Sequence, residues 1–178
     1  AKRAMVSARR VPPRAVVERL VGMQAQFAPA PYVGIWTRTT SFRREALERL
    51  LTRGDVVRAN MIRQTLHLVT RRDYALVRAA MSERNYPWES PQAKRLAPGV
   101  RALAASGPVT TADALAHLER EHGLTGIAAH RAWRAARLSA HLVHHPDLAL
   151  WRARPERRFV AIDEPEPHEP TGARAELL

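Results

Sequence analysis

The first third of the chain carries apolar residues at helical spacing. Between residues 12 and 23 they recur every three to four positions, and the proline pair that opens this stretch fits a first helical turn. The same spacing predicts helices over residues 34–38 and 42–53, and Gly54 is placed to end the second of these. We therefore expect three short helices before residue 55.

An alternation of apolar and polar residues follows the third helix. It predicts strands over residues 56–59 and 61–69, joined by a short turn. In the second strand Arg63, Thr65 and His67 share one face, because successive side chains of a strand point to opposite sides. This hairpin is predicted to be the wing of a first winged helix.

The rest of the chain repeats this order of helices and strands. Thr70 and Asp73 resemble a capping box and predict a helix to residue 82, and the prolines and glycine in residues 86–99 then mark a domain boundary. Helices followed by a two-stranded hairpin predict a second winged helix. The predicted elements are helices over 100–105, 111–122 and 127–140, strands over 142–143, 148–151 and 158–161, and a turn over 152–157.

The predicted fold class is α+β and mainly helical, with tandem winged helix-turn-helix units that carry small β-hairpin wings. The first unit spans residues 1–90 and the second spans 91–162. Residues 163–178 begin as an acidic, proline-rich linker and end like the start of another helix. Because the sequence also begins with Ala1 rather than Met, we expect a fragment or a truncated gene product.

The charge of the chain is strongly positive. Its 178 residues contain 29 Lys and Arg against 17 Asp and Glu, a formal net charge of +12. This balance favours a polyanionic partner, and double-stranded DNA is the first candidate. All the basic residues except Lys2 and Lys94 are arginine, which suits phosphates but is also typical of a GC-rich genome.

Several classes of protein are excluded by what the sequence lacks. There is no cysteine, so disulfides and thiolate metal sites are excluded and a cytoplasmic, nucleoid-associated location is expected. No His-Glu-x-x-His pattern and no glycine-rich phosphate loop occurs. We therefore expect no metal and no cofactor. No apolar run reaches the length of a membrane span, and no signal peptide opens the chain.

Two glutamines, Gln24 and Gln26, stand at the end of the first apolar stretch, just before a loop with two prolines. Side chains at this spacing do not stack on one helix face. Near a helix end or in extended backbone, however, both amides can point the same way and hold one water or sugar. The alternative is structural, since amides beside prolines often cap a helix or bond a turn.

Four stretches that include this pair carry a family resemblance. Taken in order, residues 21–26, 31–36, 56–59 and 65–69 resemble the bacterial winged-helix DNA-binding proteins that include the AlkZ-type DNA glycosylases. Those enzymes excise crosslinked or alkylated purines, and their catalytic signature is Gln, an apolar residue, then Gln. The resemblance implies that Gln24 and Gln26 are catalytic. The family usually has Gly where this chain has Gln64.

Candidate DNA contacts fall in three places. In the predicted helix 127–140, Arg131 and Arg134 lie one turn apart and suit a major groove, although a solvated face has the same pattern. The arginine-rich hairpin tip suits a minor groove or a phosphate row, with an ordinary exposed turn as the alternative. The full set, with three residues of the first wing, is Arg63, Thr65, His67, Arg131, Arg134, Arg152, Arg154, Arg157 and Arg158.

Two functions are compatible with these features. Hydrolysis of an ordinary glycosidic bond needs an acid, but a purine alkylated at N7 already carries positive charge and leaves as a neutral base. Two amides that position a water then supply what such a reaction needs. The first hypothesis is thus a DNA glycosylase, present as a fragment, that hydrolyses the N-glycosidic bond of N7-alkylated or crosslinked purines. The second is a non-enzymatic winged-helix DNA-binding module or regulator.

Overall fold

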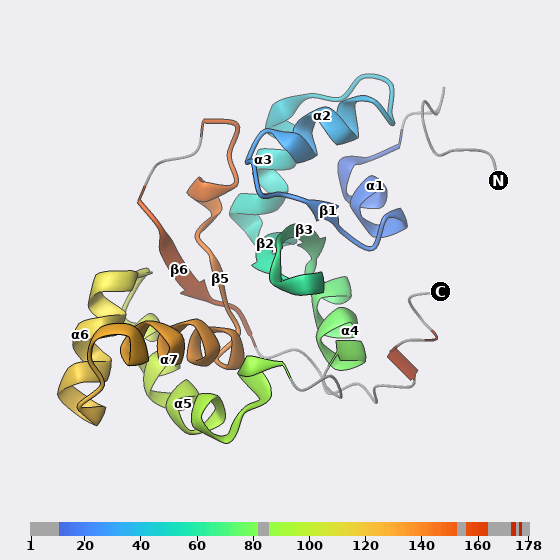
Figure 1. Ribbon diagram of the computed structural model, residues 1–178. Helices are drawn as coiled ribbons and strands as arrows, with labels where there is room; N and C mark the ends of the chain where they lie inside the picture. Colours follow the sequence, from blue (N-terminus) through green and yellow to red (C-terminus); the bar gives the residue numbers. More distant parts are fainter. Residues whose placement is uncertain (1–10, 82–85, 153–155, 164–171, 174, 176–178) are drawn as a thin grey trace.

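The fold is α+β and is organised around one antiparallel sheet (Figure 1). The computed structural model describes residues 11–81, 86–152, 156–163, 172–173 and 175. Within these residues there are seven α-helices and six strands, and the strand order is β1-β3-β2-β5-β6-β4. The strands predicted to form two small wings therefore belong to a single sheet, because β2 of the first half pairs with β5 of the second.

The first half contributes four helices and three strands. They are α1 (Pro13–Arg19), β1 (Met23–Gln24), α2 (Ala30–Trp36), α3 (Arg44–Arg53), β2 (Val56–Asn60), β3 (Leu66–Thr70) and α4 (Arg71–Met81). Local sequence signals explain several boundaries. Helix α1 begins at a proline, Gly54 ends α3 with a φ of 75°, and the Asp73 amide donates to the Thr70 hydroxyl at the start of α4.

The first predicted helix is shorter than its apolar stripe. It ends at Arg19, and the chain turns through Gly22, whose φ is 121°. A Cβ at this position would lie 2.7 Å from Cγ1 of Val69, so both the backbone conformation and the close approach of β3 require glycine. The chain then enters β1, which places Gln24 on a strand and Gln26 in the bend that follows, and neither on a helix.

The predicted strand 61–69 is wrong over its first half. Ile62–Gln64 form a 3₁₀ turn, η1, in which Arg63 and Gln64 have φ values of 54° and 59°. Arg63 therefore leaves the face that alternation assigned to it together with Thr65 and His67. The left-handed conformation of Gln64 also explains why glycine suits this position.

The second half contributes the remaining helices and strands. They are η2 (Pro87–Glu89), α5 (Pro91–Ala105), β4 (Val109–Thr110), α6 (Thr111–His122), α7 (Gly126–Ser139), β5 (Leu142–His144), η3 (Pro146–Leu148) and β6 (Arg158–Ala161). The helix break predicted at residues 98–99 is absent, because α5 runs through Pro98. An internal proline costs about 3 kcal/mol. Burial of the neighbouring Leu96 and Val100 offsets this, at roughly 1.5–3 kcal/mol for each side chain.

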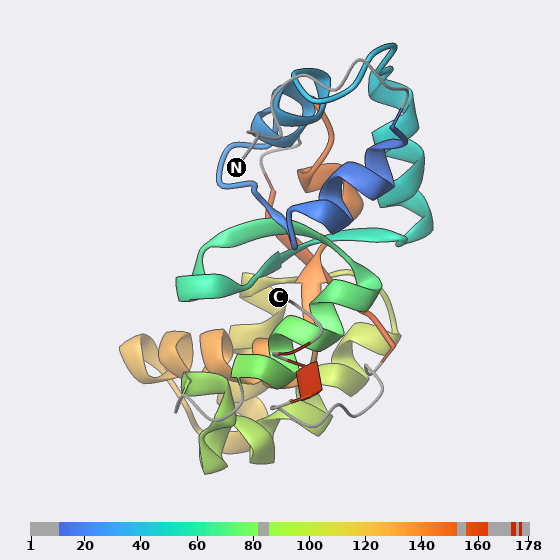
Figure 2. The same cartoon turned by 90° about the vertical axis from the view of Figure 1, so that its right-hand side faces the viewer.

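Two faces of the sheet are covered by different helices. Val56 and Leu68 pack with residues of α1, α2 and α3 in one core, whereas Val57 and Val69 pack with α4 and with Leu138 of α7 in another. Figure 2 shows the blue and cyan helices on one side of the β2–β3 ribbon and the green to orange helices on the other. A third core lies between α5, α6 and α7. In the part of the chain that the structure describes, no helix has the length and apolar character needed to cross a membrane.

Candidate functional site

Gln24 ends strand β1, and Gln26 lies in the bend that follows it. Gln24 pairs with His67 of β3, and the Ala25 amide donates to the Leu66 carbonyl oxygen at 2.7 Å. Ala25 is 1% exposed, while Gln24 and Gln26 are both exposed and line the same cleft. Both amides therefore reach the same cleft, Gln24 from the end of the strand and Gln26 from the bend after it.

The cleft has a volume of about 1080 Å³. It lies between the first half of the chain, through β1 and the β2–β3 hairpin, and the second half, through α7 and the β5–β6 connection. Among the described residues that line it there are five arginines and no aspartate or glutamate. The polar lining side chains are Gln24, Gln26, Arg58, Asn60, Gln64, Thr65, Thr111, His130, Arg134, Arg137, His144, Arg152 and Arg157.

Arg58 donates hydrogen bonds to the backbone of the glutamine motif. Its Nε donates to the Ala25 carbonyl oxygen at 2.9 Å, and Nη2 donates to that of Gln26 at 3.3 Å. The remaining nitrogen, Nη1, donates to the Leu148 carbonyl oxygen at 2.8 Å. Burial and the nearby charge of Arg157 lower the pKa of Arg58, but a guanidinium remains charged at neutral pH. One side chain therefore fixes the motif and the segment that follows β5.

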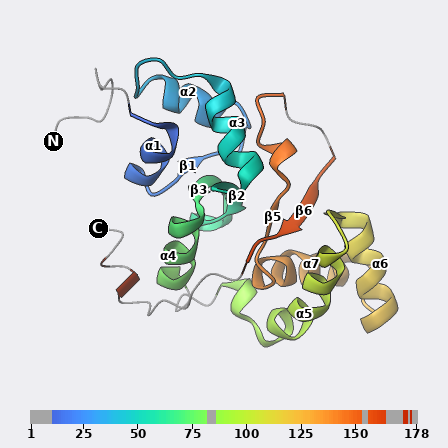
Figure 3. The same cartoon turned by 180° about the vertical axis from the view of Figure 1, so that it is seen from behind.

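That segment is also held by Tyr32 of α2. The Tyr32 hydroxyl donates to the Ala149 carbonyl oxygen at 3.1 Å, and its ring meets Trp151 edge-on at a centroid distance of 5.6 Å. Burial raises the pKa of Tyr32, so its hydroxyl stays protonated and can donate. The connection leaving β5 consequently runs beside α2 and α3 (Figure 3). Arg152 follows this connection and lines the cleft.

Arg137 of α7 lies on the opposite wall of the cleft and is linked by hydrogen bonds to the η1 turn between β2 and β3. Its Nη2 donates to Oδ1 of Asn60 at 3.0 Å, and Nδ2 of Asn60 donates to the Gln64 carbonyl oxygen at 2.8 Å. The guanidinium carbon lies 4.8 Å from the ring centroid of Phe159. Burial first, and then the charges of Arg134 and Arg157, lower the pKa of Arg137 to about 10. The chain of contacts fixes α7 against the η1 turn.

His144 is a neutral group in the cleft wall. Burial lowers its pKa to about 3, and the charges of Arg137 and Arg58 act in the same direction. Its ring packs 4.8 Å from that of Phe159. At neutral pH the cleft is thus lined by guanidinium groups, amides and an uncharged imidazole.

Comparison with known protein families identifies the family of this chain. A family model described as "DNA glycosylase AlkZ-like" matches residues 17–178. The chain belongs to the AlkZ-like DNA glycosylase family. A solved structure, the Streptomyces sahachiroi DNA glycosylase AlkZ, has a similar fold, with a TM-score of 0.79 at 18% sequence identity. The match covers 99% of this chain and 52% of that one, so the chain spans about half the length of that glycosylase. No curated protein matches the sequence.

The predicted residues of this AlkZ-like chain divide into two groups. Gln24, Gln26, Thr65, Arg134, Arg152 and Arg157 line the cleft, whereas Arg63, His67, Arg131 and Arg158 do not. His67 lies opposite Gln24 with Nδ1 3.0 Å from the Thr65 carbonyl oxygen, and Arg158 is tied to Asp147 at 3.2 Å. Arg154 and the predicted linker residues 164–171 lie outside the described residues.

Seven described polar residues of the cleft were not among the predicted contacts: Arg58, Asn60, Gln64, Thr111, His130, Arg137 and His144. Arg58 left a signal, because it is a lone charge inside the apolar strand Val56–Asn60. Arg137 appears in the sequence as the third arginine of the Arg131 and Arg134 stripe, but it is 9% exposed whereas those two are exposed. No sequence signal marks Asn60 or His144.

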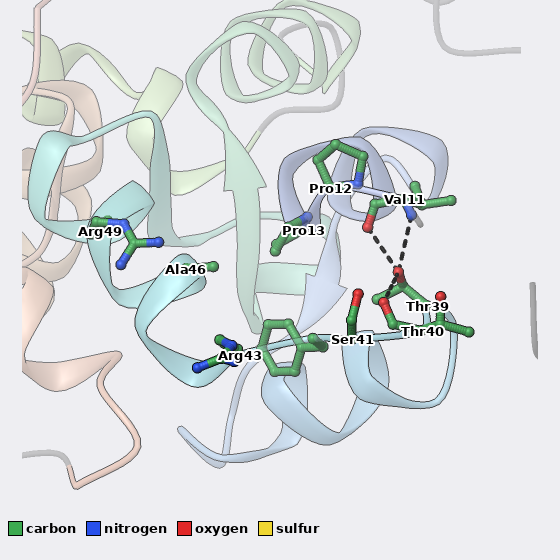
Figure 4. Close-up of a pocket in the computed structure, with 10 residues that line it drawn as sticks. Val11, Pro12, Pro13, Thr39, Thr40, Ser41, Arg43, Ala46 and Arg49 are labelled. Carbon is green, nitrogen blue, oxygen red and sulfur yellow. Dashed lines mark hydrogen bonds between the residues drawn. The ribbon is translucent and has the colours of Figure 1, made fainter. Parts of the chain in front are cut away.

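A smaller pocket of about 420 Å³ lies between the start of α1 and the α2–α3 connection (Figure 4). There the Thr39 hydroxyl accepts from the Val11 amide at 3.1 Å and donates to the Val11 carbonyl oxygen at 2.9 Å. This pocket shares no lining residue with the cleft. Within the described residues, no three His, Asp or Glu side chains gather where they could hold a metal ion.

Proposed function

We propose that this protein is a DNA glycosylase that hydrolyses the N-glycosidic bond of N7-alkylated or crosslinked purines in double-stranded DNA. Gln24 and Gln26 are the catalytic residues. Membership of the AlkZ-like family supports the reaction class. The observation that carries the substrate class is the cleft itself, which combines two exposed amides with five arginines and, in its described lining, no carboxylate.

A cleft without an acid suits a leaving group that needs no protonation. In an N7-alkylated purine the bond between C1′ and N9 breaks heterolytically, and the electron pair neutralises the positive base. Water then forms the new bond to C1′ and releases its proton to solvent. An amide oxygen accepts a hydrogen bond from that water, and an amide nitrogen donates to a sugar oxygen, so Gln24 and Gln26 orient the nucleophile rather than deprotonate it.

The arginines of the cleft are complementary in charge to the phosphates of the DNA backbone. Arg134, Arg152 and Arg157 are exposed on the cleft walls and contact phosphates in this proposal. The two halves, residues 1–90 and 91–162, act as tandem winged-helix units that share the sheet and grip the duplex from either side of the glutamines. The core between α5, α6 and α7, which lies wholly within the second half, supports that division. Arg63, exposed in the η1 turn, is a further contact outside the cleft.

Incubation with a duplex that carries one N7-methylguanine tests the reaction. Abasic sites should accumulate with the protein faster than by spontaneous loss, and normal guanine in the same duplex should stay intact. The matched variant for this experiment is Gln24→Ala with Gln26→Ala. Tight duplex binding without any excision would favour the rival function, a DNA-binding module or regulator.

A further inference from the structure

One side of the cleft holds an excess of positive charge that no described lining residue balances. Arg137 is 9% exposed, and its Nη1 is buried with no hydrogen-bond partner. Its other terminal nitrogen, Nη2, is occupied by Asn60. A buried guanidinium without a carboxylate is costly, because desolvation of the charge is not repaid by an ion pair. Stacking on Phe159 recovers only part of that cost.

Two exposed arginines line the cleft together with this buried one. Arg134 precedes it by one turn of α7, and Arg157 comes from the end of the β5–β6 connection. All three line the same cleft, in whose described lining no Asp or Glu occurs. Burial is the main cause of the lowered pKa of Arg137, and the charges of Arg134 and Arg157 lower it further. Three guanidinium groups that converge without a counter-charge form an anion site.

We propose that Arg134, Arg137 and Arg157 form a seat for one phosphate group of the bound nucleic acid, on the cleft wall that faces Gln24 and Gln26. Arg134 and Arg157 contact the phosphate oxygens, and Arg137 lies behind them. Its charge acts through a poorly solvated region, where the attraction is stronger than at the surface. The seat deepens the proposed function and rests on it, because it ties one backbone phosphate to the position of the glutamines.

With such a seat, the contribution of one phosphate to the binding free energy depends on Arg137. The probes are duplexes with a 2′-fluoro-stabilised N7-methylguanine and a single uncharged methylphosphonate linkage, moved one position at a time. For the parent protein, one linkage or two adjacent ones should weaken binding by about tenfold or more, the usual effect of losing a charge-assisted contact. In Arg137→Gln, Arg134→Gln and Arg157→Gln the same linkage should have little further effect.

Arg131→Gln is the matched control, since this exposed arginine lies on the same helix but does not line the cleft. It should keep the full effect of the sensitive linkage. If Arg137→Gln does not fold by circular dichroism, the two exposed variants carry the test. Competition with inorganic phosphate, at ionic strength matched by chloride, separates the sources of the anion. If inorganic phosphate competes in an Arg137-dependent way but no methylphosphonate linkage weakens binding, the site binds free phosphate and not a phosphate of the nucleic acid.

Failure of the seat differs from failure of the proposed function. If the parent binds and excises but no linkage is coupled to Arg137, the seat is wrong and the glycosylase proposal stands. If the parent binds no duplex at low salt, the proposed function is wrong, and the seat is then overturned with it.

Discussion

The Nε of Arg58 donates to the carbonyl oxygen of Ala25 at 2.9 Å, across 33 residues of sequence. Ala25 is the residue between the two glutamines, so its peptide group sets the direction of both amide side chains. Arg58 also pairs in register with Leu68 and His144 at the centre of the sheet. The glutamine pair is therefore held by a residue of β2, one of the two central strands of the sheet.

Arg58→Lys is expected to slow excision without an equal loss of duplex binding. A lysine keeps the charge, but it lacks the planar fork that reaches three carbonyl oxygens at once. Loss of two such hydrogen bonds costs roughly 2–4 kcal/mol of stability. Single-turnover excision, measured below the unfolding temperature of the variant, should fall by about tenfold or more, with the Kd for duplex nearly unchanged.

Arg120→Lys supplies the control for this variant, because Arg120 is exposed on α6 and remote from the cleft lining. It should behave like the parent in both assays. An Arg58→Lys protein that excises at the parental rate would show that the motif holds its conformation without the guanidinium.

The parts of the fold that follow local rules were predicted correctly from the sequence. Thr110 and Asp113 form a reciprocal capping box at the start of α6, and Gly123 ends that helix with a φ of 62°. Such signals lie within a few residues of the boundary they determine. A short motif with a family resemblance also singled out Gln24 and Gln26, which line the cleft, and their catalytic role stays a prediction.

The errors arose where distant contacts decide the conformation. Residues 148–151 read as a buried strand, but their carbonyl groups bind Arg58 and Tyr32 instead of a neighbouring strand. Pro98 read as a helix break, although burial of its neighbours keeps α5 continuous. The cleft residues Asn60 and His144 were missed for the same reason, since Asn60 is bonded by the distant Arg137 and His144 lies opposite Arg58 only when β2 pairs with β5.

Duplex affinity is expected to fall linearly with rising salt on logarithmic axes, by about 0.9 per phosphate neutralised. Replacing Arg152 and Arg157 together by Gln should flatten that slope by about one to two units and weaken all duplex sequences alike, because phosphate contacts carry no sequence information. Fluorescence anisotropy over a salt series measures both quantities. An unchanged slope would assign these arginines to an ordinary exposed turn.

Gly22→Ala is expected to destabilise the protein by roughly 1–3 kcal/mol. The φ of 121° strains any other residue, and the new Cβ would meet Val69 at 2.7 Å. Gly107→Ala isolates the first effect, because its φ of 144° is also rarely adopted by other residues and no atom lies within 4 Å of the added Cβ. Urea unfolding should show the larger loss for Gly22. Equal losses would mean that β3 moves away at little cost.

Stability is expected to fall as the solution is acidified, and His144 accounts for part of this. Its folded pKa of about 3 lies below the unfolded value of about 6.5, so the unfolded chain takes up the proton first. The contribution of His144 is therefore complete above about pH 6.5 and is lost progressively down to its folded pKa. Urea unfolding of His144→Gln should show a shallower pH dependence, by about 1.4 kcal/mol per pH unit in that window. An unchanged slope would place the imidazole in contact with water.

The glutamine pair provides the most direct test of the chemistry. Gln24→Ala and Gln26→Ala should each slow excision of N7-methylguanine by about 100-fold, the loss of roughly 3 kcal/mol that follows removal of one well-placed polar group. Duplex affinity should stay near the parental value, because a positioned water stabilises the transition state more than the bound substrate. Gln26→Asp should retain part of the rate, since a carboxylate also accepts the hydrogen bond of the water. Both side chains are exposed, Gln24 at the end of β1 and Gln26 in the bend that follows, so these variants should keep the parental unfolding midpoint. Alanine variants that excise as fast as the parent would make the two amides structural, and the water would then need another anchor among the cleft residues.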